Sequence, residues 1–204
     1  MPDSIVHPAY PLHRERINHA LEIIPRLDLD PQVPHFIFAH ILAPHPPFVF
    51  SANGEARQPD YPYVLLDGDA FPGDPAAYRS QYESQRAYLD QQLVQSLERL
   101  LEAGGTDDVL ILQADHGPGS QLNWSSMEGT NLRERLGILL AYRLPAGSQP
   151  IENPPKSPVN LFRAILNTYF DGDYRYLPDE SYYSSWEHPY DFQLVPAEQL
   201  TVGD

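Results

Sequence analysis

Apolar residues recur at helical spacing in three segments of the chain, residues 12–27, 75–103 and 157–170. Pro25 interrupts the first segment, and Asp74 precedes the second at the position of a helix cap. We therefore predict three amphipathic helices. The residues that we expect on their apolar faces are Ile17, Leu21, Ile23, Ile24 and Leu27 in the first, Tyr78, Tyr82, Leu89, Leu93, Leu97, Leu100 and Leu101 in the second, and Val159, Phe162, Ile165, Leu166 and Tyr169 in the third.

Three shorter apolar runs, residues 36–42, 108–114 and 136–144, predict buried strands. Residues 51–73 are rich in glycine, proline and aspartate and predict a long surface loop. Helices that alternate with continuous apolar strands are typical of an α/β layer with a mainly parallel sheet. We expect residues 36–42 and 109–114 to be neighbouring parallel strands of that sheet.

The length of 204 residues predicts one domain over residues 1–204, since no repeat or composition change divides the chain. A hydrophobic content of 42% argues against disorder. The tyrosine-rich segment 171–204 has no clear period, but its many aromatic side chains predict a tail that packs on the domain. No apolar run approaches the ~20 residues of a membrane helix, so we expect no membrane segment in the chain.

Charge and cysteine content narrow the classes of function. The formal net charge of −15 argues against a nucleic-acid partner, because phosphate binding depends on clustered lysine and arginine. The chain contains no cysteine, which excludes disulfides and thiolate metal sites but does not identify the compartment.

Polar side chains with metal- and anion-binding chemistry follow two of the predicted strands. His40 and His45 lie at the end of the first run, and Asp115 and His116 follow the second. Function in parallel α/β sheets gathers in the loops past the carboxyl ends of the strands. We therefore expect these residues to lie at one edge of the sheet, in a single site.

Asp115-His116-Gly117 is the strongest of these signals. A carboxylate and an imidazole at a strand end can turn toward one divalent cation if the chain bends there, and Gly117 permits a sharp bend. The alternative is that Asp115 caps a loop while His116 is partly exposed. The buried strand before the tripeptide favours the metal-binding interpretation.

His45 lies among Pro44, Pro46 and Pro47, which restrict the backbone around it. Such a loop orients an imidazole to bind an anion or to protonate a leaving group. The equally weighted alternative is that His45 packs on Phe48 for structural reasons. His40 lies within the apolar run, where a satisfied core histidine competes with a substrate contact. Arg135 precedes the third predicted strand. Its guanidinium either contacts an anion bound at the predicted site or forms an ion pair on the surface.

Taken in order, these motifs resemble those of a known superfamily. The segments "FIFAHILAPHPPFVF", "DDVLILQADHG", "ERLGILLAYRLP" and "SPVNLFRAILNTYF" resemble the sulfatase-like branch of the alkaline phosphatase superfamily, over roughly residues 33–170. That branch includes sulfatases, lipoteichoic acid synthase-type enzymes and phosphoethanolamine transferases. The resemblance implies a doubly wound α/β/α sandwich and a sulfate or phosphate ester of a small molecule, lipid or glycan as substrate.

By this resemblance, Asp115 and His116 match the metal-binding Asp-His pair. His45 matches the catalytic histidine that contacts the phosphate or sulfate. His40 and Arg135 are the further substrate-binding candidates. The cofactor is then a divalent ion, Zn²⁺, Mn²⁺, Mg²⁺ or Ca²⁺, which we expect this chain to bind weakly. Family members commonly carry this domain outside the cell behind membrane helices, but nothing in these residues shows the compartment.

The chain also departs from the pattern of the superfamily. We identify no nucleophile, because there is no cysteine and no Ser-X-Pro-X-Arg signature, and Ser120 and Thr130 lie in unremarkable contexts. We therefore interpret the chain as a C-terminal portion of a catalytic domain whose nucleophile-bearing half is absent. Two alternatives stay open, a non-catalytic metal- or anion-binding module on the same fold, and an acidic interaction domain without a site.

Overall fold

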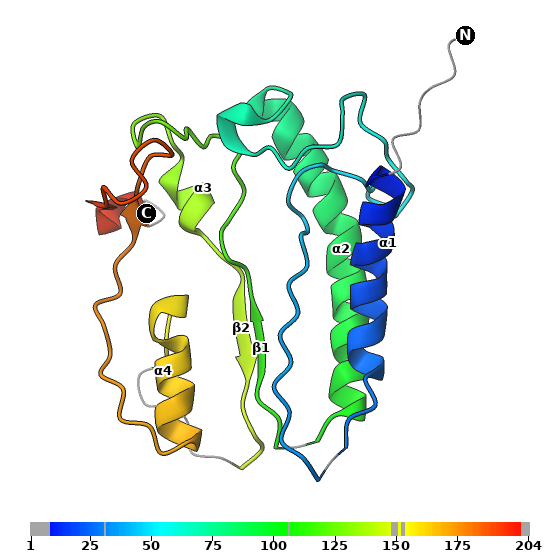
Figure 1. The fold of residues 1–204 in the computed structure, drawn as a ribbon, viewed down its shortest axis with the longest axis vertical. Helices are drawn as coiled ribbons and strands as arrows, with labels where there is room; N and C mark the ends of the chain where they lie inside the picture. The colour runs from blue at the N-terminus through cyan, green and yellow to red at the C-terminus, as the bar shows by residue number, and fades with distance from the viewer. Residues whose placement is uncertain (1–8, 31, 106, 148–150, 152–153, 201–204) are drawn as a thin grey trace. The chain divides into compact units, whose positions relative to one another are not determined.

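The computed structural model describes residues 9–30, 32–105, 107–147, 151 and 154–200 (Figure 1). The chain divides into two compact units, residues 1–104 and 105–204. The single domain over residues 1–204, with residues 171–204 as one packed tail, stays a prediction. Among the described residues, no helix combines the length and the apolar character that a membrane span needs.

The first unit is built on two long helices that lie side by side (Figure 1). Helix α1 spans Ala9–Ile23 and continues into the 3₁₀ turn η1, Ile24–Arg26, which contains the expected break at Pro25. Helix α2 spans Pro75–Ala103. The predicted cap is confirmed, because the Asp74 carboxylate accepts a 2.7 Å hydrogen bond from the Ala77 N–H. The segment between the helices is irregular except for η2, Gly68–Ala70.

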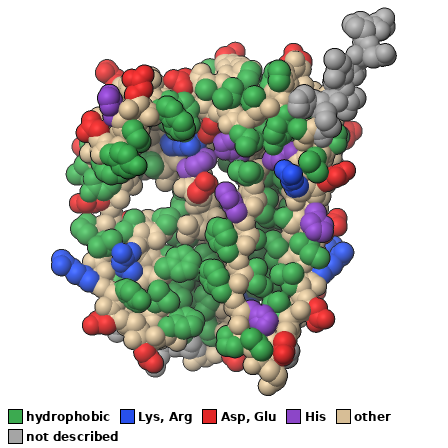
Figure 2. Space-filling model, in the orientation of Figure 1, with side chains coloured by type: hydrophobic (Ala, Val, Ile, Leu, Met, Phe, Trp, Pro, Cys, Tyr) green, Lys and Arg blue, Asp and Glu red, His purple; other side chains and the backbone are tan. Residues whose placement is uncertain are grey.

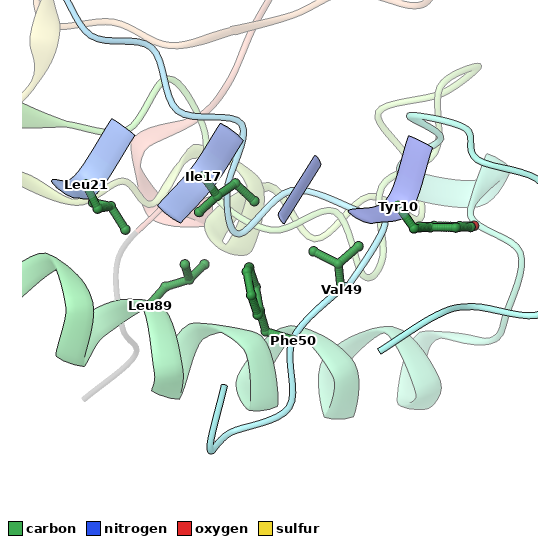
Figure 3. Packing of buried hydrophobic residues seen from close by; sticks show 6 residues of the cluster. All are labelled: Tyr10, Ile17, Leu21, Val49, Phe50 and Leu89. Atoms are coloured by element: carbon green, nitrogen blue, oxygen red, sulfur yellow. The ribbon is translucent and has the colours of Figure 1, made fainter. Parts of the chain in front are cut away.

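Helices α1 and α2 enclose the core of the first unit together with the chain around Val49. Figure 3 shows side chains from both helices pointing toward Val49 and Phe50, and the buried cluster comprises Tyr10, Ile17, Leu21, Val49, Phe50 and Leu89. Gln85 of α2 is fully buried beside them, and its side-chain oxygen accepts hydrogen bonds from the N–H groups of Val49 and Phe50. These bonds satisfy backbone groups that no strand partner reaches.

The predicted buried strand at residues 36–42 is wrong. The segment forms no strand, and Phe36 and Phe38 have exposed fractions of 82% and 79%. Within the described residues no ladder hydrogen bonds join it to another segment, so it is not a strand of the expected parallel pair. An apolar run becomes a buried strand only where other elements cover both of its faces. In this run Ile41 packs against the core cluster, whereas Phe36 and Phe38 stay exposed.

The second unit contains a two-stranded sheet covered by a helix. Strands β1, Leu110–Gln113, and β2, Leu140–Arg143, fall within the predicted runs but pair antiparallel, with Leu110 opposite Arg143. Helix α4, Pro158–Tyr169, packs on this sheet through Leu161, Ala164 and Ile165. The described strands are therefore not the expected parallel set, although the mixture of helices and sheets keeps the α/β class.

Short elements complete the second unit. Helix α3 spans Leu132–Leu136, strands β3, Tyr182–Tyr183, and β4, Gln193–Leu194, form an antiparallel pair, and η3 spans Ala197–Gln199. Tyr183 is buried against Leu132 and Val195, which joins the chain after residue 171 to α3. Figure 2 shows hydrophobic side chains gathered over β1, β2 and α4 on the face that it presents.

The inward face of α4 differs from the predicted one, because the tail lies against the helix. Phe162, expected inside, is half exposed, whereas Asn160 is buried. The Asn160 side chain donates to the Leu177 carbonyl at 2.9 Å and accepts from the Leu177 N–H at 3.0 Å. Asn167, two turns later, makes the same pair of bonds to Tyr174. The two amides thus pair with the tail backbone as a strand would.

We predict that Asn160→Ala lowers the free energy of unfolding by about 1–3 kcal/mol, because it leaves backbone groups of Leu177 unsatisfied in a partly buried place. The matched variant Asn167→Ala should lower the free energy of unfolding by less, because the hydrogen bonds between Asn167 and Tyr174 are exposed to water. Urea unfolding of both variants measures the difference. Equal losses, or a larger loss in Asn167→Ala, would contradict this account of the tail.

His13 of α1 is a buried imidazole whose Nε2 atom has no hydrogen-bond partner among the residues that the structure describes. Its ring lies 5.7 Å from that of Tyr63, and burial lowers its pKa from the usual 6.5, with nearby Arg16 adding to the effect. The folded state therefore resists protonation of His13 more than the unfolded state does.

Because the unfolded chain binds this proton more readily, we predict that stability falls as the pH drops below about 6.5, the ordinary pKa of histidine. His13→Leu should remove this part of the pH dependence, whereas His19→Gln, an exposed change on the same helix, should keep it. Urea midpoints measured from pH 8 to about pH 5, above the ordinary pKa of carboxyl groups, test this. A wild-type profile that matches His13→Leu would refute it.

Candidate functional site

The predicted metal-binding pair lies in the turn that follows β1. The Asp115 Oδ2 atom lies 3.5 Å from His116 Nε2, and the Asp115 Oδ1 atom accepts a 3.0 Å hydrogen bond from the His116 N–H. Asp115 is largely exposed, with 72% of its side chain accessible, and His116 is 31% accessible. The carboxylate and the imidazole therefore face one another at a place that solvent and ions reach.

The His116 ring is oriented by the chain that follows it. Its Nδ1 atom lies 2.9 Å from the Gly117 carbonyl oxygen. A carbonyl only accepts hydrogen bonds, so Nδ1 carries the proton in the neutral ring and Nε2 carries the lone pair. This arrangement resembles the outer-sphere hydrogen bonds that fix the tautomer of metal-binding histidines.

Gly117 is packed so closely that no other residue fits. A Cβ atom there would lie 2.0 Å from the Glu134 carbonyl oxygen and 2.5 Å from that of Gly137. The Gly117 N–H donates to the Arg135 carbonyl at 2.7 Å, and the Arg135 guanidinium donates back to the Gly117 carbonyl at 3.1 Å. The turn is thereby fixed to α3, and the glycine is required for this close approach rather than only for a bend.

The Asp115 and His116 donor atoms fit two positions of a divalent ion. Two ligand atoms on a tetrahedral zinc with bonds of about 2.0–2.1 Å lie about 3.3 Å apart, close to the 3.5 Å separation of Oδ2 and Nε2. The described residues supply no third ligand, because no group of three histidine, aspartate or glutamate side chains is placed to hold a metal. The fit is therefore to part of a metal site.

The hydroxyl groups near this turn have structural partners. Ser120 is buried and donates a 2.8 Å hydrogen bond to the Glu134 carboxylate. The Thr130 hydroxyl donates to the Ser126 carbonyl and accepts from the Asn123 N–H. These bonds close the loop between β1 and α3. That neither residue is a nucleophile stays a prediction.

His45 belongs to the first unit and lies beside a buried carboxylate. Its Nδ1 atom is 2.6 Å from the Pro46 carbonyl oxygen, and its Nε2 atom is 4.0 Å from Asp67 Oδ2. Asp67 is 4% accessible, and its other oxygen accepts a 2.7 Å hydrogen bond from the Tyr78 hydroxyl. The structure thus brings His45 together with two residues that the sequence analysis did not identify. Asp67 lies in the predicted surface loop, and no local pattern distinguishes it.

His40 and Arg135 differ in their surroundings. His40 is exposed, and its ring centroid lies 6.4 Å from that of Phe38, so the interpretation as a core histidine is wrong. Arg135 supports the Gly117 turn and lies over the Trp124 ring, 5.7 Å from its centroid. The substrate contacts predicted for both residues stay predictions, and so does the single site that would unite them with Asp115.

We predict that Gly117→Ala disrupts the Asp115-His116 turn, because the added methyl group meets backbone carbonyls that cannot move without displacing α3. The cost should be at least about 2 kcal/mol of unfolding free energy. Gly105→Ala is the control, since its Cβ would make only ordinary contacts at 3.8 Å. Thermal unfolding measures both variants, and a Gly117→Ala protein as stable as the wild type would contradict the packing described here.

Comparison with known proteins gives one family. The sulfatase family profile matches residues 7–169, a span that includes α1, α2, the Asp115-His116 turn and α4. Searches of curated proteins and of solved structures found no match. The family has the α/β fold of alkaline phosphatase, and the helices and small sheets described above are consistent with part of such a domain. The chain is therefore a member of the sulfatase family, within the alkaline phosphatase superfamily.

Proposed function

We propose that the chain forms part of a metal-dependent hydrolase or phosphotransferase that acts on a sulfate or phosphate ester. The observation that carries this proposal is the pair of donor atoms of Asp115 and His116, 3.5 Å apart on a rigid turn of a sulfatase-family chain. The family acts on sulfate esters and generally uses a divalent metal ion. Zn²⁺, Mn²⁺, Mg²⁺ and Ca²⁺ are the candidate ions here.

Each candidate residue has a role in this proposal. Asp115 and His116 hold the ion, and when bound the ion polarises an ester oxygen and favours the ionised nucleophile. Arg135 keeps the turn in place through Gly117, and in the sequence-based proposal it also contacts the anion. His45 contacts the transferred phosphate or sulfate, and His40 is a second contact to the substrate.

The nucleophile and at least one further metal ligand come, in this proposal, from residues outside this chain. A catalytic zinc site usually has three protein ligands, and the described residues bring only Asp115 and His116 together. Ser120 and Thr130 are engaged in the loop between β1 and α3. The chain alone should accordingly bind metal weakly and catalyse no turnover.

A non-catalytic module on the same fold is the second candidate function. The observation that favours it is the environment of His45, whose two ring nitrogens each face an acceptor within the protein, Pro46 and Asp67. A histidine whose nitrogens are both directed at protein groups has less capacity to bind an anion.

Metal titration of the purified chain tests the proposed site. We expect Zn²⁺ or Mn²⁺ to bind weakly, Asp115→Ala to abolish that binding, and the exposed acidic control Asp173→Ala to leave it unchanged. A chelator should hardly change the melting temperature, because stabilisation depends on the ratio of free metal to the dissociation constant. Binding that survives Asp115→Ala would refute the site.

The same protein, assayed with 4-nitrophenyl sulfate and bis(4-nitrophenyl) phosphate, should show no hydrolysis above background. Turnover that needs metal and is lost in Asp115→Ala would contradict the absence of a nucleophile from the chain. Absence of both turnover and metal binding would instead favour the non-catalytic module.

A further inference from the structure

The loop between β3 and β4, residues 184–192 (the aromatic loop), exposes three aromatic side chains. Trp186, Tyr190 and Phe192 have exposed fractions of 75%, 87% and 64%. Single exposed apolar residues are common in soluble proteins, but a group of large ones marks an interaction site. Figure 2 shows hydrophobic side chains beside acidic ones over the part of the second unit that holds α3 and the C-terminal segment.

The backbone of the aromatic loop is fixed at its base and within the loop. Strands β3 and β4 pair at the base, and the Trp186 N–H donates a 2.8 Å hydrogen bond to the Trp124 carbonyl. Inside the loop, the His188 N–H donates to the Ser185 carbonyl and the Asp191 N–H donates to the His188 carbonyl. An ordered backbone therefore presents the exposed rings, and a preorganised surface loses little conformational entropy on binding.

Other rings support two of the exposed ones. Trp186 meets Trp124 edge to face, with ring centroids 5.6 Å apart, and Phe192 meets Tyr182 in the same way at 6.3 Å. The exposed fractions of Trp186 and Phe192 show that most of each ring stays open to solvent despite these contacts. A planar group from a partner can therefore stack on a ring that is already held in place.

The aromatic loop also carries negative charge without a neighbouring lysine or arginine. Residues 176–200 contain neither of these residue types, and Glu187 and Asp191 of the loop are exposed. No ion pair within the described part of the chain includes either carboxylate. Two carboxylates thus lie among three exposed rings, and the charge of this surface is complementary to a cation.

The tryptophan pair already contacts one arginine of this chain. The Arg135 guanidinium lies 5.7 Å from the centroid of the Trp124 ring. A guanidinium is attracted to the face of an indole and is more weakly hydrated than an ammonium group, so it stacks readily. Trp186, the exposed member of the pair, offers the same kind of surface to a guanidinium from another molecule.

We propose that the aromatic loop binds an arginine-rich segment of a partner protein. An arginine guanidinium can stack on an aromatic face while its N–H groups donate to a carboxylate. Trp186 with Glu187 and Tyr190 with Asp191 are consecutive residues, so the loop supplies a ring and a carboxylate twice. An extended segment with two arginines can therefore engage both pairs. This binding requires neither a metal ion nor the activity proposed above.

An anionic membrane and a second copy of the chain fit the aromatic loop less well. Aromatic residues are enriched at membrane interfaces, but segments that bind anionic lipids also carry lysine and arginine, which residues 176–200 lack. A second copy would bring the same carboxylates, on a chain of net charge −15, against the loop. Charge complementarity therefore favours a cationic partner.

Dye-labelled peptides of repeated Arg-Gly, Lys-Gly or Glu-Gly units test the proposal, with fluorescence anisotropy of the dye as the measurement. We expect the Arg-Gly peptide to bind saturably, the Lys-Gly peptide to bind about threefold or more weakly, and the Glu-Gly peptide not to bind. Higher salt should weaken the binding, because the carboxylates are exposed. Equal binding of the arginine and lysine peptides, or binding to phosphatidylglycerol vesicles without any binding of the Arg-Gly peptide, would overturn the proposal.

The carboxylates are tested by a double variant. Glu187→Gln combined with Asp191→Asn should weaken binding of the Arg-Gly peptide by about threefold to tenfold. Glu98→Gln combined with Glu102→Gln is the matched control, because it changes the net charge equally at exposed positions of α2. This control should bind as the wild type does. Equal weakening in both double variants would show that only the overall charge matters and would overturn the proposed site.

The rings are tested at Trp186. Trp186→Ala should weaken binding of the Arg-Gly peptide at least about tenfold, whereas Trp186→Phe keeps a ring and should retain most of the affinity. Phe36→Ala removes a similarly exposed ring from the first unit and should change nothing. Wild-type affinity in Trp186→Ala would contradict the proposal, and the carboxylate variants keep the test decisive if loss of the indole also disturbs the loop.

Discussion

The close approach of Gly117 to the end of α3 is the contact on which the candidate site depends. It leaves no room for a side chain, and it allows Gly117 and Arg135 to exchange hydrogen bonds in both directions. The orientation of His116 follows, because its ring bonds to the carbonyl of the same glycine. The position of Trp124 relative to the turn follows too, through the guanidinium of Arg135. The candidate metal-binding pair, Arg135 and Trp124 thus all depend on one backbone segment.

Local signals were sufficient to predict α1, α2 and α4, but not the short α3. The Asp74 carboxylate caps α2 as predicted, and the Ser157 side chain caps α4 in the same way, because capping depends only on neighbouring backbone groups. The environment of residues 36–42 could not be predicted in the same way. An apolar run does not reveal what covers it, and the exposed rings of Phe36 and Phe38 show that burial is a tertiary property. The prediction of the inward face of α4 was wrong for a related reason. The backbone of Leu177 lies against the helix, and the polar side chain of Asn160 forms hydrogen bonds with it.

The distinction between local signals and tertiary packing also applies to the candidate site. Asp115, His116 and Gly117 are consecutive, so their proximity could be predicted from the sequence, and the structure confirms that the carboxylate and imidazole face each other. Asp67 reaches His45 from another segment, and Tyr78 in turn bonds to Asp67. Trp186 meets Trp124 although more than sixty residues separate them in the sequence. No spacing rule connects such residues, because tertiary packing alone brings them together.

The side-chain amides of Asn160 and Asn167 on α4 affect which residues the chain after residue 171 can tolerate. The side chains of Asn160 and Asn167 form hydrogen bonds with main-chain atoms of Leu177 and Tyr174. The side chains of α4 therefore fix where the backbone of residues 174 and 177 lies, whatever side chains those two residues carry. Any residue with a backbone N–H at position 174 or 177 can form both hydrogen bonds with its asparagine. Proline, which lacks the N–H, would lose one of the two bonds. The segment can change its surface chemistry while it keeps its place on α4.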